Sequence, residues 1–88
     1  MGEFKKIMLD HRTETFMAVC NVMNYREAAE LLHITQPAVT QHIQFLEKEY
    51  GCRLFLYENR KLIKTSAAQM LEDYLRSVQQ REIFSGKR

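Results

Sequence analysis

The stretch from Thr35 to Gly51 constrains the fold of this 88-residue chain more than any other part of the sequence. Pro37 suits the first turn of a helix, where its missing N–H is not needed, and Thr35 precedes it as a candidate N-cap. Gly51 supplies the left-handed residue that commonly follows a helix end. Between them, apolar residues recur at helical spacing, at Val39, Ile43, Leu46 and Tyr50. The stretch predicts an amphipathic helix with one buried face and one exposed polar face.

Two shorter helices are predicted before this one. The first, over residues 12–22, has one apolar face, formed by Phe16, Val19, Cys20 and Met23. Its start is open, because Asp10 and Thr13 could each cap it. Asn24 is the next N-cap candidate, and a short helix with small residues follows. Residues 33–35 then form a tight turn, in which His33 stands where Gly is common; His tolerates the left-handed conformation at modest cost.

After this long helix the pattern changes to two short apolar runs, residues 54–57 and 62–63, around a polar tip at 58–61. Runs of this length around a polar tip predict a β-hairpin. The order of helix, short helix, turn, helix and hairpin is that of a helix-turn-helix followed by a wing. The predicted fold class is therefore mainly α: a winged helix-turn-helix over residues 1–65, with a three-helix core and a two-stranded wing.

A last, long helix is predicted from Ala67 to about Gln80, capped by Thr65 or Ser66. Its apolar stripe is too long to be covered by so small a body, so we expect a partner helix from a second copy of the chain. The expected dimer interface consists of Ala67, Leu71, Tyr74, Leu75 and Val78. Residues 66–82 are thus predicted to be a dimerisation linker helix, and residues 83–88 a frayed tail.

Composition and charge narrow the classes of function. A chain this short has a thin core and little room for a deep enzyme pocket. The net charge is only +2, but residues 51–88 carry eight basic and four acidic side chains, which weakly indicates an anionic partner. The histidines and the two cysteines lack metal-ligand spacing, and no catalytic constellation is present. We therefore expect no enzyme activity, no metal and no cofactor.

The central motif closely resembles the N-terminal DNA-binding domain of LysR-type transcriptional regulators, over about residues 13–78. The resemblance is carried by Ala28-Ala29, Leu32, Thr35-Gln36-Pro37-Ala38-Val39-Thr40, Ile43, Leu46-Glu47, Gly51 and Leu54-Phe55. Thr65-Ser66-Ala67 resembles the start of the linker helix that pairs two subunits in that family. The resemblance implies sequence-specific binding of double-stranded DNA by a homodimer, on an operator that is an interrupted palindrome.

The resemblance also implies that the recognition helix enters the major groove, with Thr35, Gln36, Pro37, Ala38, Thr40 and Gln41 at the DNA surface. Gln44 lies on the same polar side and is included as a candidate. A helix N-terminus at Thr35 suits a phosphate, and Gln side chains pair well with adenine edges. The wing is expected to approach phosphates or the minor groove through Arg60, Lys61 and Lys64.

Several residues depart from the family pattern. An Arg near Tyr57, a Gly near Ala68 and a Leu near Lys64 are usual in the family, and many relatives carry Arg at Gln41 and Gln44. This recognition helix is therefore less basic than most, and an operator sequence cannot be transferred from the family. Lys64 is expected to add a wing contact of its own.

The family normally carries a C-terminal effector-binding domain, which this sequence does not include. We therefore expect the chain to be a fragment, with a naturally short regulator as the alternative. A small-molecule effector and a higher oligomer are expected only with that further domain. No stretch reaches the roughly 20 apolar residues of a membrane span, and no signal peptide opens the chain, so a cytoplasmic, nucleoid-associated location without membrane contact is expected. A winged-helix module that binds protein is the competing hypothesis, favoured by the low net charge.

Overall fold

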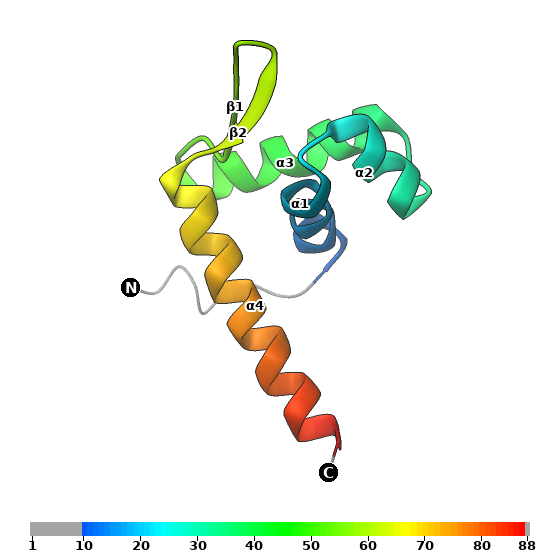
Figure 1. The fold of residues 1–88 in the computed structure, drawn as a ribbon, viewed down its shortest axis with the longest axis vertical. Coiled ribbons are helices and arrows are strands. Elements are labelled where there is room, and N and C mark those ends of the chain that lie inside the picture. Colours follow the sequence, from blue (N-terminus) through cyan, green and yellow to red (C-terminus); the bar gives the residue numbers. More distant parts are fainter. Residues whose placement is uncertain (1–9, 88) are drawn as a thin grey trace.

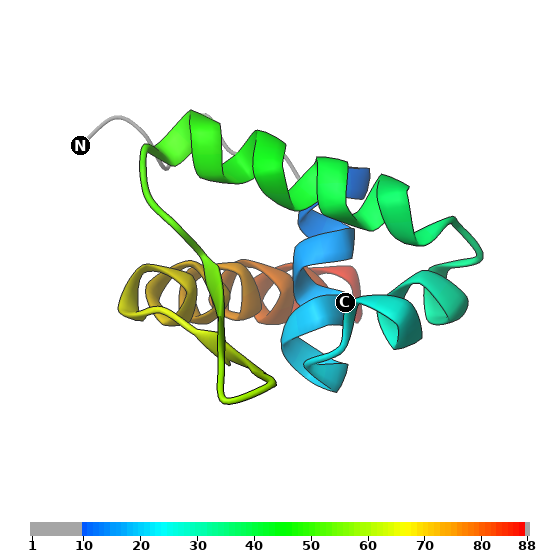
Figure 2. The ribbon, with the colours of Figure 1, turned by 90° about the horizontal axis from the view of Figure 1, so that it is seen from above.

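The computed structural model describes the backbone of residues 10–87 and the side chains of residues 10–78. The described part contains four helices and one antiparallel hairpin: α1 (His11–Val22), α2 (Tyr25–Leu32), α3 (Gln36–Tyr50), β1 (Phe55–Glu58), β2 (Lys61–Lys64) and α4 (Ser66–Lys87). Helix α3 lies across α1, with α2 near one end of α3 and the hairpin near the other (Figures 1 and 2). The hairpin and α4 extend in opposite directions (Figure 1). This is the predicted winged helix-turn-helix followed by a long helix.

Side-chain caps fix where the first three helices begin. Asp10 is the N-cap of α1 in a reciprocal capping box with Thr13, which settles the open choice between these two residues. Asn24 Oδ1 accepts the Glu27 N–H at 2.8 Å, and Thr35 Oγ1 accepts the Ala38 N–H at 3.2 Å. Each cap satisfies an N–H group that the helix leaves unpaired, and its loss costs about 1 kcal/mol. The capped helix starts predicted from the sequence are confirmed.

Left-handed residues end α2 and α3, as predicted. His33 follows α2 with φ 60°, and its N–H and that of Ile34 bond back to carbonyls of α2. Gly51 follows α3 with φ 69°. These tight ends set the short turn between α2 and α3 and direct the chain from α3 into the wing.

The core lies between α1, α2, α3, the base of the hairpin and the first half of α4. It consists of side chains with almost no exposed surface, led by Phe16, Val19, Val39, Ile43, Leu54, Phe55, Leu71 and Leu75. Burying a side chain of this size stabilises the fold by about 1.5–3 kcal/mol. The Phe55 ring packs 5.6 Å from the Phe16 ring and edge-on to the Tyr25 ring, which ties the wing to α1 and α2.

The hairpin is tighter than the sequence predicted. Glu58 pairs with Lys61 at the end of the two strands, so the loop is only Asn59 and Arg60, not the whole tip 58–61. Both loop residues have positive φ, 53° and 64°. This is the geometry of a two-residue type I′ turn, whose twist matches that of the strands.

Helix α4 differs from the prediction in its end and in its buried face. Its backbone continues to Lys87, beyond the predicted end at about Gln80. Thr65 accepts the Ala68 N–H at 3.1 Å and so caps this helix. Leu71 and Leu75 are 2% and 0% exposed because they pack into the protein's own core. They are therefore not available to a partner helix.

Candidate nucleic-acid interface

The outward face of α3 carries most of the polar residues predicted to meet DNA. Gln36, Pro37, Gln41 and Gln44 are exposed and Thr40 is half-buried. Together these five residues line one shallow, open depression. Thr35 caps the helix beside it, and Ala38 is half-buried outside its lining. The structure thus brings together five of the seven residues predicted to meet DNA on α3 and its N-cap.

The opposite face of α3 holds the helix in place. Val39, Ile43 and Leu46 are between 0% and 4% exposed in the core. His42 Nδ1 lies 2.8 Å from Thr15 Oγ1, which in turn donates to the His11 carbonyl at 2.8 Å. Since a hydroxyl has one hydrogen to donate, His42 Nδ1 must carry the proton in this contact. The polar face of α3 is therefore presented from a firmly anchored helix.

Phe45 lies on the outward side of α3 but does not extend the polar depression. The Arg12 guanidinium stacks 3.8 Å from the centroid of the Phe45 ring. Arg12 also pairs with Asp10 at 3.3 Å. A cation over an aromatic face stabilises such a contact by about 0.5–1 kcal/mol at an exposed site. Phe45 therefore packs against the start of α1.

The N-terminus of α3 favours an anion. Its first turn contains no acidic residue, and Pro37 has no N–H to satisfy. The partial positive charge of a helix N-terminus attracts phosphate groups, and unpaired N–H groups can donate to them. Negative charge can therefore approach α3 at the same end where Gln36 and Pro37 are exposed.

Two of the three cations predicted for the wing are free to meet a phosphate, and one is not. Arg60 and Lys61 are exposed at and beside the tip of the hairpin. Lys64, at the end of β2, is only 26% exposed, and its Nζ lies 2.6 Å from Glu72 Oε1. Its charge is therefore used inside the protein, and Lys64 does not belong with the exposed cations of the wing.

Sequence reasoning missed a second cleft, between α3 and the wing. It shares Thr40 and Gln44 with the depression on α3 and adds Arg53 and Tyr57. The Arg53 side chain is 66% exposed; it donates to Glu47 and to the Phe55 carbonyl. The period of two in a strand places Tyr57 on the same face as the buried Phe55, which was the available signal for it. Tyr57 is 68% exposed at the end of this face.

Glu47 fixes the wing to the end of α3. Its carboxylate accepts the N–H groups of Leu54 and Phe55 at 2.8 and 3.4 Å, as well as Arg53 Nε at 3.4 Å. Three donors from consecutive residues, at the point where the chain enters β1, converge on a side chain that is only 15% exposed. The orientation of the wing relative to α3 is therefore held by a charge-assisted cluster.

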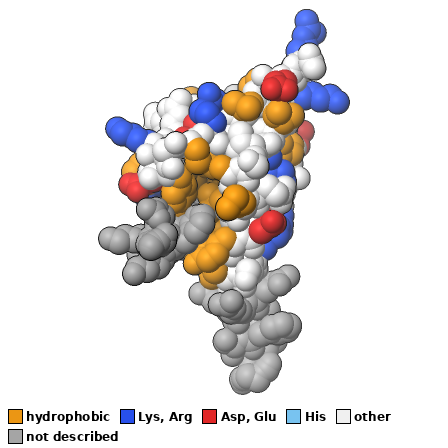
Figure 3. All heavy atoms as spheres, turned by 90° about the vertical axis from the view of Figure 1, so that its left-hand side faces the viewer, with side chains coloured by type: hydrophobic (Ala, Val, Ile, Leu, Met, Phe, Trp, Pro, Cys, Tyr) orange, Lys and Arg blue, Asp and Glu red, His pale blue; other side chains and the backbone are white. Residues whose placement is uncertain are grey.

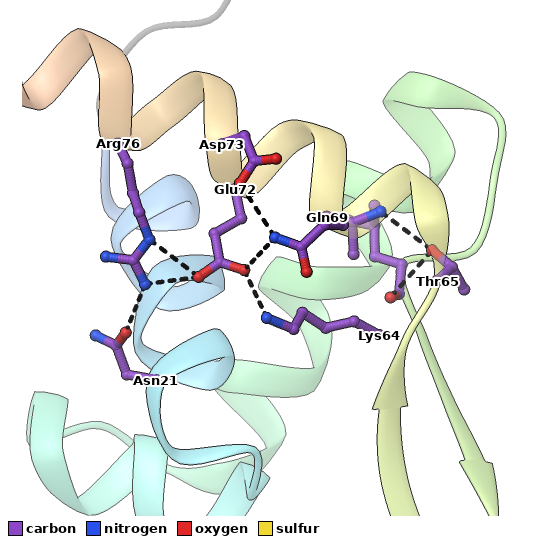
Figure 4. A network of polar contacts seen from close by, with 9 residues as sticks. Asn21, Lys64, Thr65, Gln69, Glu72, Asp73 and Arg76 are labelled. Atoms are coloured by element: carbon purple, nitrogen blue, oxygen red, sulfur yellow. Dashed lines mark hydrogen bonds and ion pairs between the residues drawn. The ribbon is translucent and has the colours of Figure 1, made fainter.

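A polar network connects α4 to the rest of the fold (Figure 4). Glu72 receives Lys64 on one oxygen and Arg76 on the other, at 2.6 Å each. Burial alone would raise the pKa of Glu72, but hydrogen bonds from Lys64 and Arg76, with their charges, outweigh burial and hold its pKa below the ordinary value. Glu72 is therefore a carboxylate at neutral pH. Arg76 Nη2 also donates to Asn21 Oδ1 at 3.0 Å, which links α4 to α1.

The side chains of α4 that are accessible to a partner differ from the predicted set. Ala67, Tyr74 and Val78 are half-buried, and Met70, which was not predicted, is 63% exposed. Hydrophobic side chains form a band between the hairpin and the grey end of α4 (Figure 3). No group of three or more metal-ligating side chains occurs within the described residues. None of the described helices is long and apolar enough to span a membrane.

Comparison with known proteins agrees with this geometry. Residues 11–69 match the family model for the bacterial regulatory helix-turn-helix proteins of the lysR family. The chain belongs to the LysR family. A crystal structure of a LysR-family transcriptional regulator from Eggerthella lenta DSM 2243 is similar over 77% of this chain and 97% of that one, with 59% identity and a TM-score of 0.75. The CbnR DNA-binding domain in a DNA complex is 29% identical over 91% and 92% of the two chains, with a TM-score of 0.78.

Curated LysR-type relatives are longer than this chain. The transcriptional regulator YxjO of Bacillus subtilis strain 168 is 40% identical over 65 residues, which are 74% of this chain and 22% of the relative. CitR of the same organism is 38% identical over 73% of this chain and 25% of its own length. The chain spans about a quarter of the curated relatives that it matches. The LysR winged helix-turn-helix fold predicted from the sequence is confirmed.

Proposed function

We propose that this chain is the DNA-binding domain of a LysR-type transcriptional regulator and that α3 reads base edges in the major groove of double-stranded DNA. The observation that carries the proposal is the uncharged polar face of α3, formed by Gln36, Pro37, Thr40, Gln41 and Gln44. Structural relatives include the CbnR and BenM DNA-binding domains, both of which are known as complexes with DNA. Amide side chains on a groove-entering helix give base discrimination with little net charge.

Each kind of side chain on this face of α3 has its own proposed contact with DNA. Gln36 and Gln41 donate to and accept from base edges, for which adenine is the preferred partner of Gln. Pro37 and Ala38 offer apolar contact to a thymine methyl group, and Thr40 serves base or phosphate. Thr35 and the first-turn N–H groups bind a phosphate.

Groups around α3 position the DNA backbone. Arg60 and Lys61 on the wing contact phosphates or the minor groove. Arg53 and Tyr57 border the cleft that continues the depression on α3, so we add them to the backbone contacts. These groups provide affinity, whereas α3 provides sequence discrimination.

The binding unit in this proposal is a homodimer formed through α4, with two recognition helices about 34 Å apart or a multiple of that distance, on an interrupted palindrome. The contact surface is revised to the side chains that the fold leaves accessible: Ala67, Met70, Tyr74 and Val78. In a full-length regulator, an effector-binding domain and a higher oligomer complete the assembly. The partner DNA places the protein in the cytoplasm, at the nucleoid.

A fluorescence-anisotropy titration with a duplex selected from a random pool tests the proposal. Gln36→Ala should weaken binding about 5- to 150-fold, which corresponds to the roughly 1–3 kcal/mol of a base-edge contact, and Pro37→Ala should weaken it by less, because the contact of Pro37 is apolar. Glu49→Ala is the matched control, because Glu49 is exposed on the same helix but outside the depression. If all three variants bound the duplex as tightly as wild type, the assignment of α3 as the recognition helix would be contradicted.

Binding to a protein is the second candidate function, favoured by the acidic Glu47 in the lining of the cleft and by the net charge of only +2. Salt dependence separates the two candidates. Neutralising Z phosphates gives a log–log slope of affinity against salt of about −0.9Z on B-DNA. A slope corresponding to several phosphates supports DNA binding, and a flat profile supports the protein-binding candidate.

A further inference from the structure

Glu72 is the one charged residue that is buried among the described side chains, at 4% exposure. Its oxygens receive Lys64 Nζ at 2.6 Å, Arg76 Nη2 at 2.6 Å and Arg76 Nε at 3.1 Å. Gln69 Nε2 approaches at 3.5 Å. No part of the proposed DNA-contacting face uses this cluster. A buried carboxylate is costly unless it is paired in this way, so the cluster holds its partners firmly in place.

The cluster connects three separate elements (Figure 4). Lys64 is the last residue of β2, Glu72 and Arg76 lie on α4, and Arg76 continues to Asn21 on α1. On its apolar side, α4 is fixed by Ala68, Leu71 and Leu75 in the core. Contacts of two kinds, apolar packing and this polar cluster, therefore fix the tilt of α4 relative to the winged domain.

The tilt of α4 has an effect at a distance because the dimer surface proposed on it reaches Val78. Val78 lies twelve residues after Ser66, which is about 18 Å along the helix at a rise of 1.5 Å per residue. A change in tilt of about 10° therefore moves this end of the dimer surface by roughly 3 Å. A base pair of B-DNA occupies about 3.4 Å along the duplex axis, so this displacement corresponds to about one base pair in each subunit.

We propose that Glu72 is a positioning residue that sets the distance between the two recognition helices, and hence the spacing of half-sites that the dimer prefers. The inference rests on the proposed homodimer through α4. Glu72 acts through Lys64 and Arg76 and touches no DNA. Its role is to fix the angle between the helix that pairs the subunits and the domain that carries α3.

Removing the charge of Glu72 should move α4 away from the end of β2. Glu72→Gln keeps the size of the side chain but leaves the cations of Lys64 and Arg76 close together with no anion between them. Repulsion then drives the end of β2 and the turn of α4 that carries Arg76 apart, because like charges at partly buried positions are poorly screened. Asp73→Asn is the matched control, since Asp73 is the next residue on α4, exposed, and bonded only to Gln69 in the described contacts.

The experiment uses the 88-residue chain and duplexes that carry either one selected half-site or two half-sites at every integer spacing. Wild type and Asp73→Asn should prefer the same spacing. Glu72→Gln should bind the single half-site within about twofold of wild type but shift its preferred spacing by one or two base pairs, or lose the preference. The inference would be overturned if Glu72→Gln preferred the same half-site spacing as wild type and discriminated equally strongly against the other spacings.

Further outcomes separate this inference from the function on which it rests. Wild type that binds one half-site without any spacing preference overturns the homodimer and this inference together, but not DNA binding. Wild type that binds no duplex overturns the proposed function itself. If Glu72→Gln does not fold, the double variant Lys64→Leu with Glu72→Leu decides by the same criterion, since apolar replacement of a buried ion pair commonly preserves stability.

Discussion

Lys64 Nζ lies 2.6 Å from Glu72 Oε1, an ion pair that joins the last residue of the wing to α4. Lys64 occupies a position expected to contact DNA, but its charge serves to balance a buried carboxylate. The family resemblance places a Leu near this position, so Lys64 and Glu72 form a polar link where an apolar contact is usual. Lys64 therefore stabilises the fold, whereas Arg60 and Lys61 of the wing are exposed to a ligand.

The first prediction concerns Lys64→Met. The free energy of unfolding should fall by about 1–3 kcal/mol, because a buried acceptor loses one of its two charged partners. The salt slope of DNA binding should stay at the wild-type value, because Lys64 neutralises no phosphate. Urea unfolding and a salt titration measure the two effects. A slope reduced by about one unit would show that Lys64 contacts DNA after all.

The second prediction concerns the wing tip, where stability and binding should change in opposite directions. Arg60 has φ 64° in a type I′ turn, a conformation that favours Gly. Arg60→Gly should therefore raise the free energy of unfolding by up to about 1 kcal/mol. It should also weaken DNA binding and reduce the salt slope by about one unit. A variant that is more stable yet binds with an unchanged slope would remove Arg60 from the interface.

How well a feature of this fold could be predicted depends on how local its cause is in the sequence. Caps and helix ends such as Thr35 and Gly51 are local, so they could be predicted from neighbouring residues. The polar face of α3 could be predicted as well, because its apolar residues recur at helical spacing and leave the polar ones on the other side. In contrast, the stripe on α4 has the same period whether it faces a partner or the protein's own core, and only the tertiary structure shows that Leu71 and Leu75 are internal.

Other features depend on contacts distant in sequence. Nothing local indicates that Lys64 is paired with a residue eight positions later on another element. The sequence predicts the wing in the right place but with a longer loop than the structure has, because Asn59-Arg60 is a weaker turn signal than Asn-Gly. The cleft with Arg53 and Tyr57 exists only when the wing is folded against α3.

The third prediction concerns pH. Burial, followed by the nearby charges of His11 and Arg12, lowers the pKa of His42 below its ordinary value. A His whose pKa is lower in the folded state contributes stability that is fully present above its unfolded pKa of about 6.5 and is lost as pH falls through the folded value. The free energy of unfolding should therefore decrease below pH 6.5.

Two variants assign this pH dependence. His42→Gln should flatten the decrease just below pH 6.5, whereas His33→Gln, at an exposed turn residue, should leave it unchanged. The lowered pKa of Glu72 adds a second loss of the same sign at more acidic pH, below the ordinary carboxyl range. Denaturant unfolding at a series of pH values measures both. A decrease that persists in His42→Gln would assign the titration to another group.

The fourth prediction concerns the two free thiols. Cys20 is buried, and burial followed by the charge of Glu72 raises its pKa to about 12, whereas Cys52 is exposed. Since the thiolate is the reactive form, a disulfide reagent at pH 8 should modify Cys52 quickly and Cys20 only as fast as the protein opens. Cys52→Ser should abolish the fast phase. Two equally fast thiols would contradict the packing of α1 against α4.

Selection of duplexes from a random pool, by wild type and by Gln41→Ala in parallel, tests most directly whether α3 reads bases. Wild type should enrich two related half-sites in inverted orientation, and Gln41→Ala should lose preference at one base pair of each half-site while keeping the others. Glu49→Ala should enrich the wild-type sequence. A pool without enrichment, or an identical sequence from Gln41→Ala, would contradict the account.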